Sequence, residues 1–182
     1  MKETSRLGYA ILGLLQMNPA SGYDLRKIFS STSMKTYSDS PGAIYPALRR
    51  LEEEGLIRGT VEEGSGMRRR QIFRLTPKGL AELKRWITSP VTVEDLIRGG
   101  QEILLRFAFS ETAAGPATTL RLLRSLENAL QAHLPALRRE FDAIKTKAPT
   151  SGRLAFECGI RGCESLMKWT HHAIATYERS SK

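Results

Sequence analysis

The sequence predicts a mainly α protein with a small β-hairpin, and three observations support this expectation. Apolar residues recur at helical spacing through most of the 182 residues. One pair of short alternating segments, residues 56–62 and 70–75, flanks a turn of the type Glu-Gly-Ser-Gly. Residues 1–90 carry 15 Lys and Arg against 9 Asp and Glu, whereas residues 91–182 carry 13 against 10. The first half is therefore the part expected to meet a polyanion.

Two helices are predicted before residue 31. Asn18-Pro19 ends the first, which we interpret as a core helix rather than a signal peptide. Ser21 caps the second, because Asp24 follows three residues later and its carboxylate can bond the free amide of the cap. A polar connector follows over residues 30–38. The apolar stripes of the two helices are Leu7, Ala10, Ile11, Leu14 and Leu15, and then Leu25, Ile28 and Phe29.

A third helix is predicted from about Ser40 to Gly55, with Pro41 in its first turn. At about 100° per residue, the apolar stripe falls on one face and a polar face lies opposite. Pro46 lacks an N–H, so the helix is either kinked there or begins late enough for that amide not to be needed. The stripe consists of Ile44, Ala47, Leu48 and Leu51, and the opposite face of Gly42, Tyr45, Pro46 and Arg49, with Arg50 at its border.

The hairpin is followed by a fourth helix, in which Thr76 is the cap and Pro77 the first residue. Ser89-Pro90 ends the first domain, so we expect domains over residues 1–89 and 90–182. The apolar side of this helix is Leu80, Leu83, Trp86 and Ile87.

The second half is expected to be entirely helical, with one helix ending before Ser110 and a long one kinked at Pro135. Residues 149–152 break the chain, and a last helix follows. Gly159 and Gly162 each cost this helix on the order of 1 kcal/mol relative to Ala, so we expect another backbone to approach them closely. The leucine-rich stripes of these helices exceed what one chain can bury, which predicts a homodimer.

A capped basic helix followed by a hairpin with an arginine-rich tip is typical of a winged helix-turn-helix, which presents the helix to the DNA major groove and the hairpin to the backbone. Arg49 can bind guanine bidentately and the Tyr45 hydroxyl can bond phosphate, although a solvated helix face would look the same. Three adjacent arginines repel one another unless an anion neutralises them, although charge also protects an edge strand. The residues expected at DNA are Lys35, Ser38, Ser40, Gly42, Tyr45, Pro46, Arg49, Arg50, Arg68, Arg69 and Arg70.

Other classes of site are not indicated by the sequence. Glu52, Glu53 and Glu54 lack a metal-spaced or titratable partner, and adjacent His171 and His172 diverge on a helix. Cys158 and Cys163 match no zinc spacing and are expected to be buried free thiols in a reducing cytoplasm. No phosphate-binding Gly loop, nucleophile motif or run of about 18 apolar residues is present. We therefore expect a cytoplasmic protein that is not an enzyme and needs no metal or cofactor.

Three aromatic residues, Trp86, Phe107 and Trp169, are expected to pack in a core or an interface. The alternative is that some of them line a pocket for a small aromatic or apolar effector.

Four segments resemble the PadR family of bacterial transcriptional regulators. The longest is Gly-Ala-Ile-Tyr-Pro-Ala-Leu-Arg-Arg-Leu-Glu-Glu-Glu-Gly-Leu-Ile at residues 42–57, and the others are residues 10–15, 21–25 and 74–79. The second half is similar to the longer C-terminal domain of the phenolic-acid-responsive and virulence-activator members. The resemblance implies a C-terminal helical dimerisation domain, which places two winged domains on a pseudo-palindromic operator. Some members bind small aromatic or cationic molecules.

The residues and the resemblance together predict a homodimeric, sequence-specific regulator of transcription, more often a repressor than an activator, which binds double-stranded DNA and responds to a small molecule. The alternative is a winged-helix protein-interaction module that docks an acidic protein and does not itself bind DNA.

Overall fold

The computed structural model describes residues 4–37, 40–63, 69–98 and 100–180. The chain divides into two compact units. The first runs to Ile87 and includes Thr112–Ala114, and the second comprises Thr88–Glu111 and Gly115–Lys182.

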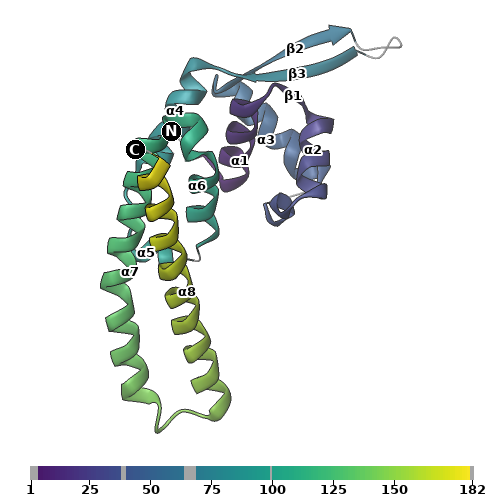
Figure 1. The fold of residues 1–182 in the computed structure, drawn as a ribbon. Helices are drawn as coiled ribbons and strands as arrows, with labels where there is room; N and C mark the ends of the chain where they lie inside the picture. Colours follow the sequence, from purple (N-terminus) through teal and green to yellow (C-terminus); the bar gives the residue numbers. More distant parts are fainter. Residues whose placement is uncertain (1–3, 38–39, 64–68, 99, 181–182) are drawn as a thin grey trace. The chain divides into compact units, whose positions relative to one another are not determined.

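The first unit contains a helical N-terminal half and then a hairpin and a helix, in the order that the sequence predicts (Figure 1). A short 3-10 turn, Ser33–Thr36, lies within the connector that was expected to be irregular. Its helices are α1 (Arg6–Met17), α2 (Gly22–Ser31), α3 (Pro41–Glu53) and α4 (Pro77–Thr88), and its strands are β1 (Ala20–Ser21), β2 (Ile57–Glu63) and β3 (Arg69–Leu75).

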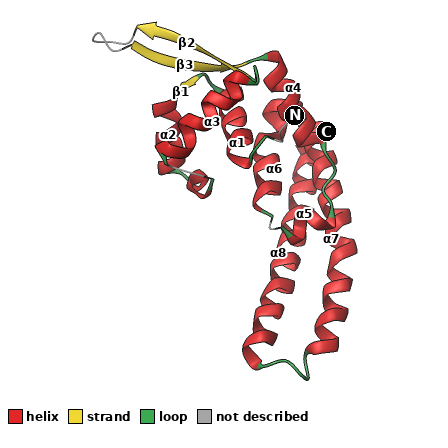
Figure 2. Cartoon of the chain, turned by 180° about the vertical axis from the view of Figure 1, so that it is seen from behind, coloured by secondary structure: helices red, strands yellow, loops and turns green. Residues whose placement is uncertain are grey.

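The sheet is antiparallel, with β3 between β1 and β2 (Figure 2). The hairpin register runs from Ile57 opposite Leu75 to Glu63 opposite Arg69. β1 was not predicted, because its two residues are too few to show an alternating pattern. It pairs Ala20 with Phe73 and Ser21 with Ile72, and so joins the start of α2 to the hairpin.

The predicted helix ends of this unit are confirmed. The Ser21 hydroxyl accepts from the Asp24 amide at 3.2 Å, and Asp24 Oδ2 accepts from the Ser21 amide at 3.1 Å. α3 ends at Glu53, and Gly55 follows its C-cap with a φ of 70°, the left-handed conformation that glycine adopts without strain. The Thr76 hydroxyl caps α4 by accepting from the Gly79 amide at 3.0 Å.

α3 places its apolar stripe in the core of the unit, as predicted. Ile44, Leu48 and Leu51 are 0%, 1% and 2% exposed. The helix begins at Pro41 and continues through Pro46, so of the two alternatives for this proline the late start is wrong. Since Pro46 has no N–H, the usual helical bond to the Gly42 carbonyl is missing there. The side chains on the opposite face are exposed.

The second unit consists of helices, and α7 and α8 lie side by side as a long hairpin (Figure 1). Several predicted boundaries are wrong. α6 does not end before Ser110, because the buried Ser110 hydroxyl bonds the Phe107 carbonyl at 2.8 Å and the Thr119 hydroxyl at 2.8 Å, which satisfies it inside the helix. The residues 150–152 belong to α8. The helices are α5 (Val93–Ile97), α6 (Gln101–Ala114), α7 (Pro116–Ile144) and α8 (Thr150–Ser180).

The core of the second unit lies between α6, α7 and α8. Nothing lies within 4 Å of a methyl group added at Gly159 or Gly162 of α8, so none of the described backbone of this chain approaches them, and a close approach by a second copy stays a prediction. The expectation that both cysteines of α8 are buried is wrong. Cys158 is exposed and Cys163 is half-buried, and both are free thiols. The core consists of Val91, Ile103, Leu122, Leu126, Ala129 and Leu130, with Leu96, Phe107, Cys163, Leu166, Met167 and Trp169 packed against it.

Candidate nucleic-acid interface

The exposed face of α3 carries the side chains that the sequence assigns to DNA. Tyr45 is 49% exposed, and Gly42, Pro46, Arg49 and Arg50 are exposed as well. Within the described part of the chain, Arg49 and Arg50 form no ion pair, although α3 also carries acidic side chains at its C-terminal end. Their charge is therefore available to an external anion.

Tyr45 is held by the start of α2. A methyl group added at Gly22 would meet Tyr45 Cε1 at 2.7 Å and Leu48 Cδ1 at 3.3 Å, so the aromatic ring lies directly against the Gly22 α-carbon. The absence of a side chain at Gly22 thus creates the space that this ring occupies. This role of Gly22 could not be predicted from the sequence, because it depends on the packing of α2 against α3.

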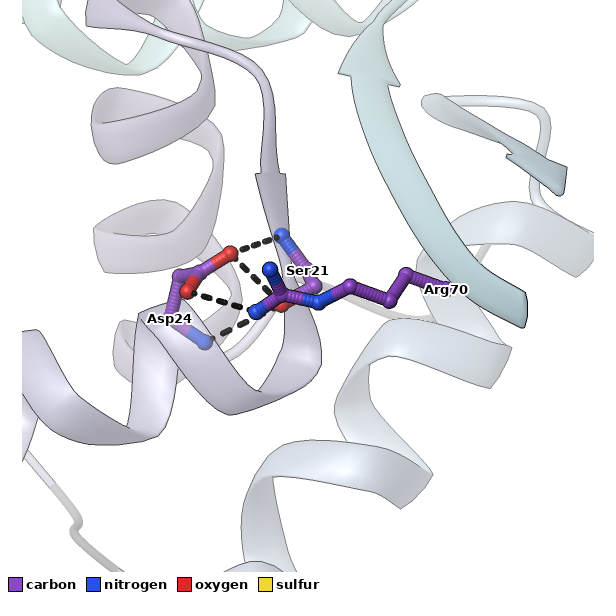
Figure 3. A network of polar contacts seen from close by, with 3 residues as sticks. All are labelled: Ser21, Asp24 and Arg70. Atoms are coloured by element: carbon purple, nitrogen blue, oxygen red, sulfur yellow. Dashed lines mark hydrogen bonds and ion pairs between the residues drawn. The ribbon is translucent and has the colours of Figure 1, made fainter. Parts of the chain in front are cut away.

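Arg70 reaches from β3 to the start of α2, where it joins a polar network with Asp24 and Ser21 (Figure 3). Arg70 Nη2 donates to Asp24 Oδ1 at 3.2 Å, and the Ser21 hydroxyl donates to Asp24 Oδ2 at 2.6 Å. The hydrogen bond from the Ser21 side chain and the charge of Arg70 both lower the pKa of the Asp24 carboxyl below its usual value. Asp24 is therefore a stable anion next to one of the predicted DNA-contacting arginines.

The other predicted contacts are described only in part. Lys35 lies exposed in the short 3-10 turn, and the Ser40 hydroxyl accepts from the Gly42 amide at 3.2 Å at the start of α3. Arg69 belongs to β3, where its backbone lies opposite Glu63. Two predicted contacts, Ser38 and Arg68, and the side chain of Arg69 lie outside the described residues.

Glu52 connects α3 to the hairpin, which gives one residue of the acidic run a structural role. Its Oε1 accepts from the Gly59 amide at 2.6 Å. Glu53 is exposed. The anionic end of α3 is thus turned partly toward the protein, which leaves the first half of the helix as its cationic part.

The three aromatic residues proposed for an effector belong to different units. Trp86 stacks on Tyr9 in the first unit, with ring centroids 4.2 Å apart and planes 4° apart, and it is 7% exposed. Phe107 and Trp169 meet edge to face in the second unit, with centroids 5.0 Å apart. All three therefore contribute to packing, and Phe107 and Trp169 are the pair that the structure brings together.

A groove of about 570 Å³ lies between α7 and α8. It contains two ion pairs, Arg138 with Glu164 and Arg161 with Glu157, each at 2.6 Å. None of the three proposed effector residues lines it. The lining residues are Arg138, Phe141, Glu157, Ile160, Arg161, Glu164, Ser165 and Lys168.

In the described ranges, no three His, Cys, Asp or Glu side chains come together in a way that would hold a metal ion. None of the described helices combines the length and the apolar character that crossing a membrane requires.

Comparison with known proteins gives a family match within the first unit and relatives that match about half of the chain. A model of the transcriptional regulator PadR-like family matches residues 11–85. The negative transcriptional regulator PadR of Bacillus subtilis is 36% identical over 94 residues, which are 49% of this chain and 51% of that protein. The probable transcriptional regulator Rv1176c of Mycobacterium tuberculosis is 30% identical over 86 residues, 47% of this chain and 46% of that protein. The match thus spans about half the length of these relatives.

Solved structures align over more of the chain but at lower similarity. The crystal structure of Bacillus subtilis PadR in complex with operator DNA has a TM-score of 0.43 and 22% identity, and covers 94% of this chain and 98% of that one. The PadR-like regulator BC1756 from Bacillus cereus has a TM-score of 0.42 and 19% identity, and covers 97% and 98%.

Proposed function

Because residues 11–85 place this chain in the transcriptional regulator PadR-like family, a family of regulators rather than enzymes, we propose that it is a homodimeric repressor that binds double-stranded DNA sequence-specifically. The observation that carries this proposal is the cationic outer face of α3, on which Tyr45 is 49% exposed and Arg49 has no ion pair with a described residue. The name of the Bacillus subtilis relative, a negative regulator, supports repression rather than activation.

On DNA, α3 would enter the major groove and the β2–β3 hairpin would follow the neighbouring backbone. Arg49 would read a base edge, because a guanidinium can donate two parallel bonds to guanine. Tyr45, one turn earlier, would bond a phosphate. Lys35, Ser40, Arg50 and Arg69 would add phosphate contacts that position the helix without reading sequence.

The second unit supports the dimer, because apolar side chains at the end of α7 and the start of α8 are left uncovered. Leu154 is 59% exposed and Ile144 is 36% exposed, whereas residues of α7 nearer its start, such as Leu126, are 1% exposed. A second copy would cover these residues, and a pseudo-palindromic operator would require the two α3 helices of that dimer to reach half-sites about 34–36 Å apart. We accordingly assign DNA binding to residues 1–89 and dimerisation to residues 90–182.

An effector would act by favouring a dimer in which the two α3 helices no longer match the half-sites. Phe107 and Trp169 are the proposed contacts for a small aromatic or apolar molecule, since both are half-buried and their rings meet edge to face. Trp86 is the weaker candidate, because its face is already stacked on Tyr9. The site of action is the cytoplasm, where bacterial DNA lies.

The test is DNA binding by the purified full chain, measured by fluorescence anisotropy with a duplex from its own upstream region and with a scrambled duplex. We expect preference for the upstream duplex and a loss of about 10³–10⁵ in affinity between 50 and 200 mM salt, as for a dimer with roughly 6–10 phosphate contacts. Sedimentation across micromolar concentrations should show a dimer. Binding that does not depend on salt, or no binding at all, would favour the protein-interaction module instead.

A further inference from the structure

Arg70 is directed away from its own hairpin and toward α2 (Figure 3). Its cross-strand neighbour is the carboxylate-bearing Glu62. Glu62, however, is paired with Arg74, whose Nη2 donates to Glu62 Oε1 at 2.9 Å. Arg70 instead donates to Asp24, 46 residues away in the chain. The nearest acid of the hairpin is thus taken by another arginine, and the Arg70 guanidinium connects two separate elements.

The position of Asp24 does not depend on Arg70. Asp24 Oδ2 accepts from the Ser21 amide at 3.1 Å and from the Ser21 hydroxyl at 2.6 Å, and both donors belong to the cap of α2. The second oxygen, Oδ1, is left to accept from Arg70 at 3.2 Å. The carboxylate is therefore a fixed anchor for the more flexible arginine side chain.

The backbone joins the same two segments next to this ion pair. Ser21 of β1 lies opposite Ile72 of β3, two residues from Arg70 along the strand. β1 has only two residues, so its ladder alone leaves the direction of the long hairpin weakly constrained. Besides the bond from the Gly59 amide to Glu52 of α3, the Arg70–Asp24 pair attaches the hairpin to α2, on the side of the ladder nearer the hairpin turn.

We propose that Arg70 is a positioning residue and not a ligand of DNA phosphate, and that together with Asp24 it sets the direction of the β2–β3 hairpin relative to α2. This inference rests on the proposed DNA binding, and it replaces the phosphate contact that the sequence predicts for Arg70. A correctly directed hairpin brings its remaining cations to the DNA backbone while α3 lies in the groove. Asp24 then contributes to affinity although it is an acid in a DNA-binding unit.

The inference is tested with the full chain and three variants: Asp24→Asn, Arg70→Gln and the double variant. Asn keeps one oxygen for Ser21 but removes the charge and turns an NH₂ group toward Arg70. The side chains of the pair are 48% and 41% exposed, and pairs of this kind contribute little. We expect each single variant to bind the wild-type protein's preferred duplex roughly 2- to 5-fold more weakly, and the double variant to be no weaker than the single ones.

The dependence of affinity on salt distinguishes positioning from phosphate contact. If Arg70 positions the hairpin, the slope of log affinity against log salt should change by much less than the value of about 1 that a lost phosphate contact gives. Arg74→Gln is the matched control. This substitution removes the Arg74–Glu62 ion pair, whose side chains are 52% and 50% exposed. Because that pair joins the two strands of the hairpin and does not reach α2, its loss should leave affinity within about 2-fold. Thermal unfolding of every variant verifies that it is folded.

Four results would overturn the inference while leaving DNA binding intact. Three concern the single variants: a slope reduced by about 1 in Arg70→Gln, tighter binding by Asp24→Asn, or unchanged affinity in both. The fourth is additive losses in the double variant, because independent contacts add. A wild-type protein that binds no duplex, or whose binding does not depend on salt, would overturn both this inference and the proposed function.

Discussion

The ring of Tyr45 lies against the α-carbon of Gly22, so the orientation of an exposed tyrosine on α3 is set by a glycine at the start of α2. Although Tyr45 is 49% exposed, one edge of its ring is thus packed on a neighbouring helix. The contact couples the first helix of the helix-turn-helix to a side chain that would meet DNA.

Gly22→Ala is therefore expected to weaken operator binding more than it weakens the fold. The new methyl group would meet Tyr45 Cε1 at 2.7 Å, and the ring can turn away at a cost of about 0.5–1.5 kcal/mol. We expect a several-fold loss of affinity by anisotropy and a small shift in urea unfolding. In a Tyr45→Ala background the same substitution should have no further effect on affinity, and an undiminished effect there would disprove the coupling.

Arg49 is expected to contribute to the choice of DNA sequence, whereas Arg69 is expected to strengthen binding to every sequence alike. Arg49→Ala should cost about 1–3 kcal/mol on the preferred duplex and relax the choice of base at one position, because it removes a base contact. Arg69→Ala should weaken matched and scrambled duplexes alike and reduce the salt slope by about 1, because it removes a phosphate contact. Binding to both duplexes over a salt series measures this, and the reverse pattern would mean that helix and hairpin have exchanged roles.

Glu52→Ala is expected to destabilise the first unit. The Gly59 amide donates to Glu52 Oε1 at 2.6 Å, and loss of a partly buried bond to a charged acceptor costs about 1.5–3 kcal/mol. Urea unfolding measures the change in free energy. Glu53→Ala is the matched control, since Glu53 is exposed and should change stability by less than about 0.5 kcal/mol. Equal effects of the two substitutions would contradict the role of Glu52.

Replacement of two helical glycines by alanine is expected to change the stability of the protein in opposite directions. A methyl group at Gly79 of α4 would collide with the Leu56 carbonyl oxygen, which is backbone and cannot move aside cheaply, so Gly79→Ala should cost about 1–3 kcal/mol. At Gly159 of α8 nothing lies within 4 Å, so Gly159→Ala should stabilise the chain by up to about 1 kcal/mol. Thermal and urea unfolding compare the two, and a stabilised Gly79→Ala would show that the packing of α4 on Leu56 is wrong.

The order of helices and the hairpin could be predicted from the sequence because their determinants are local. Ser21 with Asp24, Pro41 after Ser40, and Gly55 each act within a few residues of the feature that they control. The buried stripe of α3 follows from its periodicity alone. The exposure of the opposite face of α3, with Gly42, Tyr45, Pro46 and Arg49, follows from the same pattern.

Features that depend on distant residues could not be predicted. The partner of Arg70 lies 46 residues away, and the sequence between them does not indicate which acid it will reach. α6 runs past Ser110 because that hydroxyl is satisfied by Thr119 of the next helix. In each case the deciding atom belongs to another element.

The pairing of β1 with β3 has a consequence for synthesis of the protein. Ala20 and Ser21 find their partners only at Phe73 and Ile72, so a ribosome must add some fifty further residues before the short strand can close its ladder. Until then α2 can form, because its N-terminal cap is local, but the three-stranded sheet cannot. The N-terminal unit therefore completes its fold late in translation of its own segment, and a transcript truncated before codon 72 would yield helices without a sheet to anchor them.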